Sequence, residues 1–205
     1  MSRSGNGGSR LSPAAAGRSL TAVTDAETRT GSNADQAEGP VVFLGDSLTE
    51  AGHWADYFPE LDVVNAGRSG DTTADVYDRL SEVIERKPAT VVVMVGTNDF
   101  GLRATVEQVV RGTENILFTL HRELPSLRVI VVSVLPRERE RSEWIHQVNI
   151  HVRQFAPTVK ATFLDLWPVF AEEDGELKPQ YSPDRLHLND AGYAAWAEHL
   201  RPLLT

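Results

Sequence analysis

The sequence predicts an α/β domain built on a parallel sheet of about five strands, with helices on both faces of the sheet. Short runs rich in β-branched residues are apolar at nearly every position, which is typical of strands covered on both sides. Longer segments with helical periodicity alternate with these runs. This βαβα order favours one parallel sheet between two helical layers.

Five short segments fit the strand pattern. They are VVFL at 41–44, LDVVN at 61–65, TVVVMV at 90–95, RVIVVSV at 128–134 and the weaker TFLDL at 162–166. Amphipathic helices are expected between them, over 71–86, 105–124 and 142–155. A fourth helix is expected to start after Asn189, a residue type that caps helix N-termini, and to run to Leu203.

The first 39 residues differ from the rest of the chain. They contain no aromatic residue and are rich in Gly, Ser and Thr, so they cannot bury enough apolar surface to offset the entropy of ordering. We expect a disordered tail over 1–39 and one domain over 40–205. No stretch has the pattern of a secretion signal or the length of a membrane span, which favours a cytoplasmic location.

The composition argues against several classes of partner. The 205 residues carry a formal charge of −9 at pH 7, whereas nucleic acids and anionic membranes are bound by clustered Lys and Arg. We therefore expect no nucleic-acid and no membrane partner. The chain contains no cysteine, which excludes disulfides and thiolate metal sites. Nothing in the sequence indicates an oligomeric state.

Small and polar residues follow the first three predicted strands. Gly45-Asp46-Ser47 follows the first, NAGRSG at 65–70 the second and GTND at 96–99 the third. In parallel sheets the carboxyl ends of the strands lie at one edge, where ligands bind. The sequence therefore predicts a site at this edge.

The residues for nucleophilic catalysis are present. Ser47 lies where a strand gives way to a helix, so its hydroxyl can be exposed while its N–H opens the helix. A serine needs a base within hydrogen-bond reach, and in SPDRLHLND one turn can bring the carboxylate of Asp184 to the imidazole of His187. Gly67 and Asn98 offer N–H donors that, with Ser47 N–H, would bind an oxyanion. Taken singly, these residues are better explained as a helix cap, a surface loop and ordinary turn residues.

Four segments together resemble the blocks of the SGNH (GDSL) hydrolase family. They are GDSLTE, NAGRSGDTT, VGTND and DRLHLNDAGY, in that order. The resemblance implies that Ser47 is the nucleophile, His187 the general base and Asp184 the acid that orients it. It also implies an oxyanion hole of Ser47, Gly67 and Asn98, a flavodoxin-like three-layer α/β/α fold, and no metal or other cofactor.

We therefore expect a serine esterase, a carboxylic ester hydrolase that acts on small or short-chain acyl esters through an acyl-enzyme on Ser47. By the resemblance, O-acetylated carbohydrates are one substrate class. An acyltransferase, a lysophospholipase or a thioesterase would use the same site, and a non-catalytic carbohydrate- or partner-binding module would use the same scaffold. Leu48, Arg68 and Phe100 adjoin the motifs and are candidates to shape the acyl pocket, whereas 136–144 is interpreted as a solvated face.

Overall fold

A computed structural model of the chain describes residues 39–204. The disordered tail that the sequence predicts over 1–39 lies outside this range except for Gly39, and it stays a prediction. Within the described range, no helix has the length and apolar character needed to span a membrane. The cytoplasmic location likewise stays a prediction.

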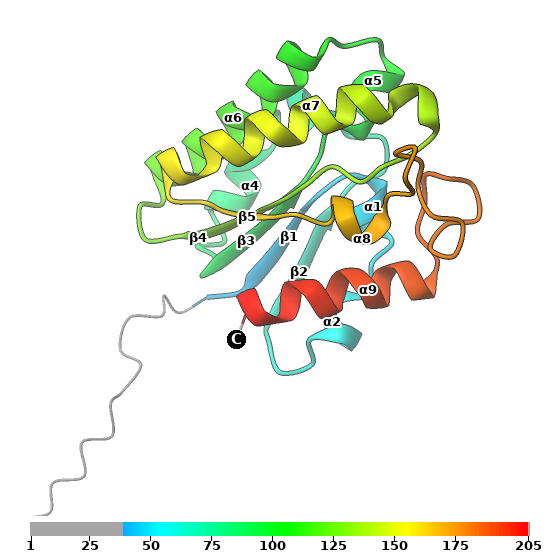
Figure 1. The fold of residues 1–205 in the computed structure, drawn as a ribbon. Coiled ribbons are helices and arrows are strands. Elements are labelled where there is room, and N and C mark those ends of the chain that lie inside the picture. The colour runs from blue at the N-terminus through cyan, green and yellow to red at the C-terminus, as the bar shows by residue number, and fades with distance from the viewer. Residues whose placement is uncertain (1–38, 205) are drawn as a thin grey trace, which may run out of the picture. The chain divides into compact units, whose positions relative to one another are not determined.

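Five parallel strands form the central sheet, in the order β2-β1-β3-β4-β5 (Figure 1). All five strands predicted from the sequence are present, and the edge strand β2 begins and ends two residues later than expected. Each strand pairs in parallel with its neighbours. The strands are β1 Val41–Gly45, β2 Val63–Gly67, β3 Thr90–Met94, β4 Arg128–Val132 and β5 Thr162–Leu164.

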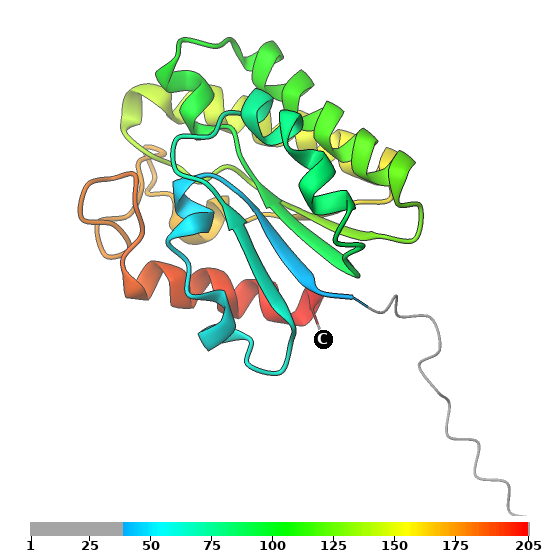
Figure 2. The ribbon, with the colours of Figure 1, turned by 180° about the vertical axis from the view of Figure 1, so that it is seen from behind.

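Helices cover both faces of the sheet, which gives the expected three layers (Figures 1 and 2). The helices are α1 Ser47–Glu50, α2 Trp54–Tyr57, α3 Thr73–Asp78, α4 Leu80–Ile84, α5 Thr97–Gly101, α6 Val106–Glu123, α7 Arg139–Phe155, α8 Trp167–Phe170 and α9 Asp190–Leu200, with 3₁₀ turns at Ala156–Val159 and Arg201–Leu203.

Alternate residues of the strands belong to two separate cores. Val42 and Leu44 of β1 pack with apolar residues of α3, α4, α6 and α7. Phe43, on the opposite face, packs with residues of α1, α2, α8 and α9. There its ring stacks on Trp54 with centroids 4.3 Å apart, and Trp54 meets Trp196 edge to face at 4.7 Å. Such aromatic pairs contribute about 0.5–1.5 kcal/mol each beyond the area they bury, so this cluster fixes α2 and α9 against β1.

Two helices differ from their predicted bounds. The helix expected over 71–86 is divided into α3 and α4, because the backbone at Arg79 (φ −106°, ψ 13°) departs from helical geometry. Helix α7 begins at Arg139, three residues before its predicted start. The capping box of Thr105 and Gln108 starts α6 where the sequence predicts, and Asn189 caps α9 by accepting the Gly192 N–H at 3.0 Å.

Candidate active site

Ser47 occupies the junction between the buried strand β1 and helix α1. Asp46 caps the helix: its carboxylate accepts the Leu48 N–H at 3.0 Å, and its carbonyl accepts the Thr49 and Glu50 N–H groups. Within residues 39–204 the Ser47 N–H itself makes no hydrogen bond. The turn therefore presents a half-buried hydroxyl together with an unused donor at the start of the helix.

Asp184 and His187 form the pair that the sequence predicts. The Oδ2 atom of Asp184 lies 2.8 Å from Nδ1 of His187, and its Oδ1 atom accepts the backbone N–H groups of His187 and Leu186. The hydrogen bond to the imidazole, helped by these N–H groups, holds the pKa of Asp184 well below its ordinary value. Because an ionised carboxylate only accepts, Nδ1 carries a proton and Nε2 keeps its lone pair for use as a base.

Helix α9 holds the loop of His187 at the edge that carries Ser47. The Tyr193 hydroxyl, in the first turn of α9, donates to the Leu48 carbonyl at 2.9 Å. Burial raises the pKa of Tyr193 to about 12, so this donor stays protonated. Figure 1 shows the 171–189 loop beside α1, past the carboxyl ends of the strands. The topology thus brings the segments of all three predicted catalytic residues to one edge.

Gly67 does not fit its predicted role as an oxyanion donor. Its N–H already donates to the side-chain oxygen of Asn65 at 2.9 Å. Gly67 is the last residue of β2, and a Cβ atom there would lie 2.2 Å from the backbone nitrogen of Glu50. The glycine is required because β2 packs closely against α1, and its N–H is engaged within its own strand.

Gly70, which the sequence analysis did not consider, has an N–H that is available to a ligand at the same edge of the sheet. It lies in the turn that the Asp71 N–H closes on the Arg68 carbonyl at 3.2 Å, and its φ of +86° is one that glycine adopts without strain. Within the described range its N–H makes no hydrogen bond. The sequence contains one hint that favours Gly70 over Gly67. Asn65 lies two residues before Gly67, and an asparagine side chain can accept the backbone N–H of the residue two positions later.

Asn98, in the first turn of α5, is held in one orientation. Its amide nitrogen donates to the Asp71 carbonyl at 2.9 Å. Because a carbonyl only accepts, the nitrogen faces this loop, and its second N–H remains for a ligand. Ser47, Gly70 and Asn98 therefore each retain an unused N–H on neighbouring loops of one sheet edge, as an oxyanion hole requires.

The family model for GDSL-like lipases and acylhydrolases matches residues 43–195. The chain belongs to this family. It is 38% identical over 177 residues to human platelet-activating factor acetylhydrolase IB subunit alpha1. The matched region covers 82% of this chain and 76% of the human protein. A solved GDSL-like lipase from Bacteroides thetaiotaomicron has 26% identity and a TM-score of 0.71, covering 80% of this chain and 86% of the lipase. A lipase/acylhydrolase from Enterococcus faecalis has the same fold, with a TM-score of 0.70 and 22% identity. The match covers 82% of this chain and 95% of the lipase chain.

This GDSL hydrolase is thus a carboxylic ester hydrolase, as the sequence predicts. Of the residues expected to shape its acyl pocket, Leu48 and Phe100 are buried in the two cores, and Arg68 pairs with Glu82.

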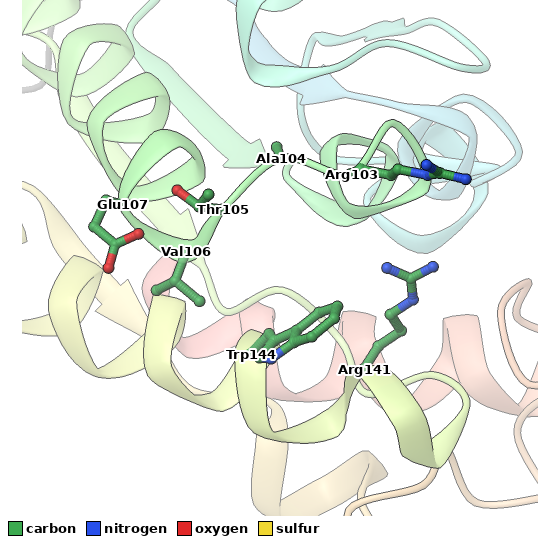
Figure 3. A pocket seen from close by; sticks show the side chains of 7 residues that line it. All are labelled: Arg103, Ala104, Thr105, Val106, Glu107, Arg141 and Trp144. Carbon is green, nitrogen blue, oxygen red and sulfur yellow. The ribbon is translucent and has the colours of Figure 1, made fainter.

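A cavity of about 530 Å³ lies between the segment that joins α5 to α6, the first turn of α6 and the first turns of α7 (Figure 3). The segment at 136–144, interpreted from the sequence as a solvated face, contributes one wall. The cavity is lined by Arg103, Ala104, Thr105, Val106, Glu107, Arg141 and Trp144.

The GDSL hydrolase also buries an acid next to its serine. Asp46 is only 1% exposed. Burial raises the pKa of its carboxyl from 3.8 to about 7; the Leu48 N–H opposes this rise and the charge of Asp99 adds to it. In the folded protein the carboxyl therefore keeps its proton up to neutral pH.

Replacing Asp46 with asparagine is expected to stabilise the protein increasingly as the pH rises. In the unfolded chain Asp46 loses its proton near its ordinary pKa of 3.8, whereas in the folded protein it keeps the proton until about pH 7. The contribution of Asp46 to the stability of the wild type therefore decreases as the pH rises between these two values. Asparagine still offers an oxygen to the Leu48 N–H and has no proton to lose.

The advantage of Asp46→Asn over the wild type should grow by on the order of 2 to 4 kcal/mol between acid and mildly alkaline pH. Urea unfolding of both proteins across this range measures it. A difference that stays constant with pH would show that the carboxyl of Asp46 titrates normally.

Proposed function

We propose that the chain is a serine esterase that removes acetyl and other short acyl groups through an acyl-enzyme on Ser47. The observation that carries this proposal is the 2.8 Å contact between Asp184 and His187, in a loop held beside the helix that begins at Ser47. This pairing gives His187 a basic Nε2 atom, and an unused backbone N–H accompanies the serine hydroxyl.

The reaction has two steps. In the first, the hydroxyl oxygen of Ser47 attacks the acyl carbonyl carbon while His187 Nε2 takes the hydroxyl proton. The tetrahedral oxyanion accepts hydrogen bonds from the N–H groups of Ser47 and Gly70 and from the Asn98 side chain. Collapse of this intermediate expels the alcohol, which receives the proton from His187. In the second step, water attacks the acyl-enzyme by the same sequence and releases the acid.

Asp184 stabilises the imidazolium that forms in each step. Its carboxylate stays ionised, because the hydrogen bond from the imidazole and the two backbone N–H groups lower its pKa. The negative charge of Asp184 is therefore present before the proton moves from Ser47 to His187. It can stabilise the imidazolium without any rearrangement of the site.

Two observations support a short acyl group. The relative that is 38% identical is named an acetylhydrolase. The described residues also form one α/β/α unit in which the loops after β1, β2 and β3 are short, which leaves little protein on that side of the site to enclose a long chain. O-acetylated carbohydrates stay within the proposal, as esters with a polar alcohol.

A series of p-nitrophenyl esters from acetate to octanoate tests the acyl preference. We expect kcat/KM to be no higher for octanoate than for acetate to butyrate, because each methylene that finds no pocket gains no binding energy in the transition state. A kcat/KM that rises steadily with chain length would show that the enzyme is a long-chain lipase instead. Product analysis with an added sugar alcohol in the same assays separates hydrolysis from acyl transfer.

A further inference from the structure

A buried ion pair lies behind the proposed oxyanion donors. Arg79, at the break between α3 and α4, is 7% exposed. Its Nε atom donates to the carboxylate of Asp71 at 2.6 Å, and its Nη2 atom donates to the carbonyl of Gly45 at 3.0 Å. Gly45 is the last residue of β1, two positions before Ser47. One planar guanidinium therefore joins the end of β1 to the loop after β2.

Asp71 extends this connection to the other two donors. Its backbone N–H closes the turn that contains Gly70, and its carbonyl accepts the amide N–H of Asn98 at 2.9 Å. Its carboxylate is held by Arg79. All three donor positions are thus linked through a single residue and its ion pair.

The buried setting and the two contacts of Arg79 favour an arginine over a lysine at this position. The same buried region contains the carboxyls of Asp46 and Asp99, which are 1% and 6% exposed. A buried charge is tolerated only when it is paired and its remaining donors are satisfied. A guanidinium places donors in two fixed directions, here toward a carboxylate and a carbonyl, whereas an ammonium group is a point charge that does not reproduce this fork.

We propose that Arg79 and Asp71 are positioning residues that hold the N–H donors of Ser47, Gly70 and Asn98 in the geometry that binds the oxyanion. The proposal rests on the serine esterase function argued above. Neither residue takes part in proton transfer. Their contribution is expressed in the transition state, because a donor displaced by a fraction of an ångström loses its hydrogen bond to the oxyanion while ground-state binding is little changed.

Arg79→Lys and Asp71→Asn test this proposal with p-nitrophenyl acetate. Lysine keeps the positive charge and loses the fork, and asparagine keeps the backbone contacts and loses the ion pair. We expect each variant to lower kcat by about 10- to 100-fold with KM changed less than threefold. The affinity for a short alkyl trifluoromethyl ketone, which forms a tetrahedral oxyanion adduct with an active serine, should fall by the same factor as kcat/KM.

The double variant reveals whether the two residues act through one contact. If they do, Arg79→Lys combined with Asp71→Asn should be no slower than the slower single variant. The matched control is Arg128→Lys at the opposite edge of the sheet, where the arginine donates to the Thr90 hydroxyl and the Leu204 carbonyl. This control should keep the wild-type kcat even if it lowers the thermal midpoint as much as Arg79→Lys does.

Three outcomes would overturn the positioning role. They are an unchanged kcat in both single variants, a loss of activity that follows only the loss of folded protein, and an undiminished affinity for the ketone. Asp71→Asn keeps the test decisive if Arg79→Lys does not fold. If the wild type neither hydrolyses any ester nor reacts with a fluorophosphonate, the serine esterase function fails, whereas an active wild type with fully active variants removes only this inference.

Discussion

Ser47→Ala is expected to lower kcat for p-nitrophenyl acetate by about 10⁴- to 10⁶-fold. The hydroxyl oxygen is the atom that forms the acyl-enzyme, and no other side chain in the junction after β1 can replace it. The α1 backbone should be unaffected, because the cap is made by Asp46 and involves no side-chain atom of Ser47. Residual turnover would come from the remaining oxyanion donors and the basic imidazole.

Mass spectrometry after treatment with a fluorophosphonate gives a second readout for this variant. The wild type should gain one adduct on Ser47, and Ser47→Ala should gain none. Ser126→Ala is the matched control, since Ser126 is an exposed serine just before β4 at the opposite edge of the sheet, and it should be labelled and turn over like the wild type. Wild-type turnover in Ser47→Ala would remove the acyl-enzyme mechanism altogether.

The strands and long helices were predictable because their patterns are local. The β1 run and the β3 run after Thr90 are apolar at every position and are buried on both faces, which is what continuous hydrophobic runs indicate. The break at Arg79 was not predictable in the same way. The apolar stripe of Val76, Leu80 and Val83 continues across it, so the periodicity of the sequence is that of one helix. The break accompanies contacts from Arg79 to the Asp71 carboxylate and to the Gly45 carbonyl, and Gly45 is distant in sequence.

Parts of the site were predictable for a related reason. Asp184 and His187 are three residues apart, so their contact is local and follows from spacing. The choice between the two glycines in NAGRSG depended on where β2 ends and on which N–H the Asn65 side chain accepts, and the presence of the asparagine alone does not fix either. The single-turn helices α2, α5 and α8 were also missed, because one turn is too short to show a period. The start of α7 was placed too late because its charged first turn hides the helical pattern.

Asp184→Asn is expected to lower kcat by about 10³- to 10⁴-fold while leaving the fold intact. The asparagine oxygen can still accept the N–H groups of Leu186 and His187 that now bind Oδ1. Its NH₂ group would then face Nδ1 of His187 in place of a carboxylate oxygen. Because an NH₂ group donates, it favours the tautomer with the proton on Nε2, which cannot accept the proton of Ser47. Activity is therefore lost because the proton of His187 sits on the wrong nitrogen, and not because the structure changes.

The pH dependence distinguishes this cause from a general loss of stability. In the wild type the hydrogen bond from His187, together with the backbone N–H groups, lowers the pKa of Asp184, so the carboxylate is ionised at neutral pH and well below it. We expect attack by free hydroxide to sustain part of the activity of Asp184→Asn, so that its kcat/KM keeps rising at alkaline pH where the wild type has levelled off. The control is Asp174→Asn, an exposed acid in the same connecting loop, which should keep both the wild-type rate and the wild-type pH profile. If Asp184→Asn kept the wild-type rate and profile, the carboxylate would have no part in setting the tautomer of His187, and the pair at 2.8 Å would be a structural contact only.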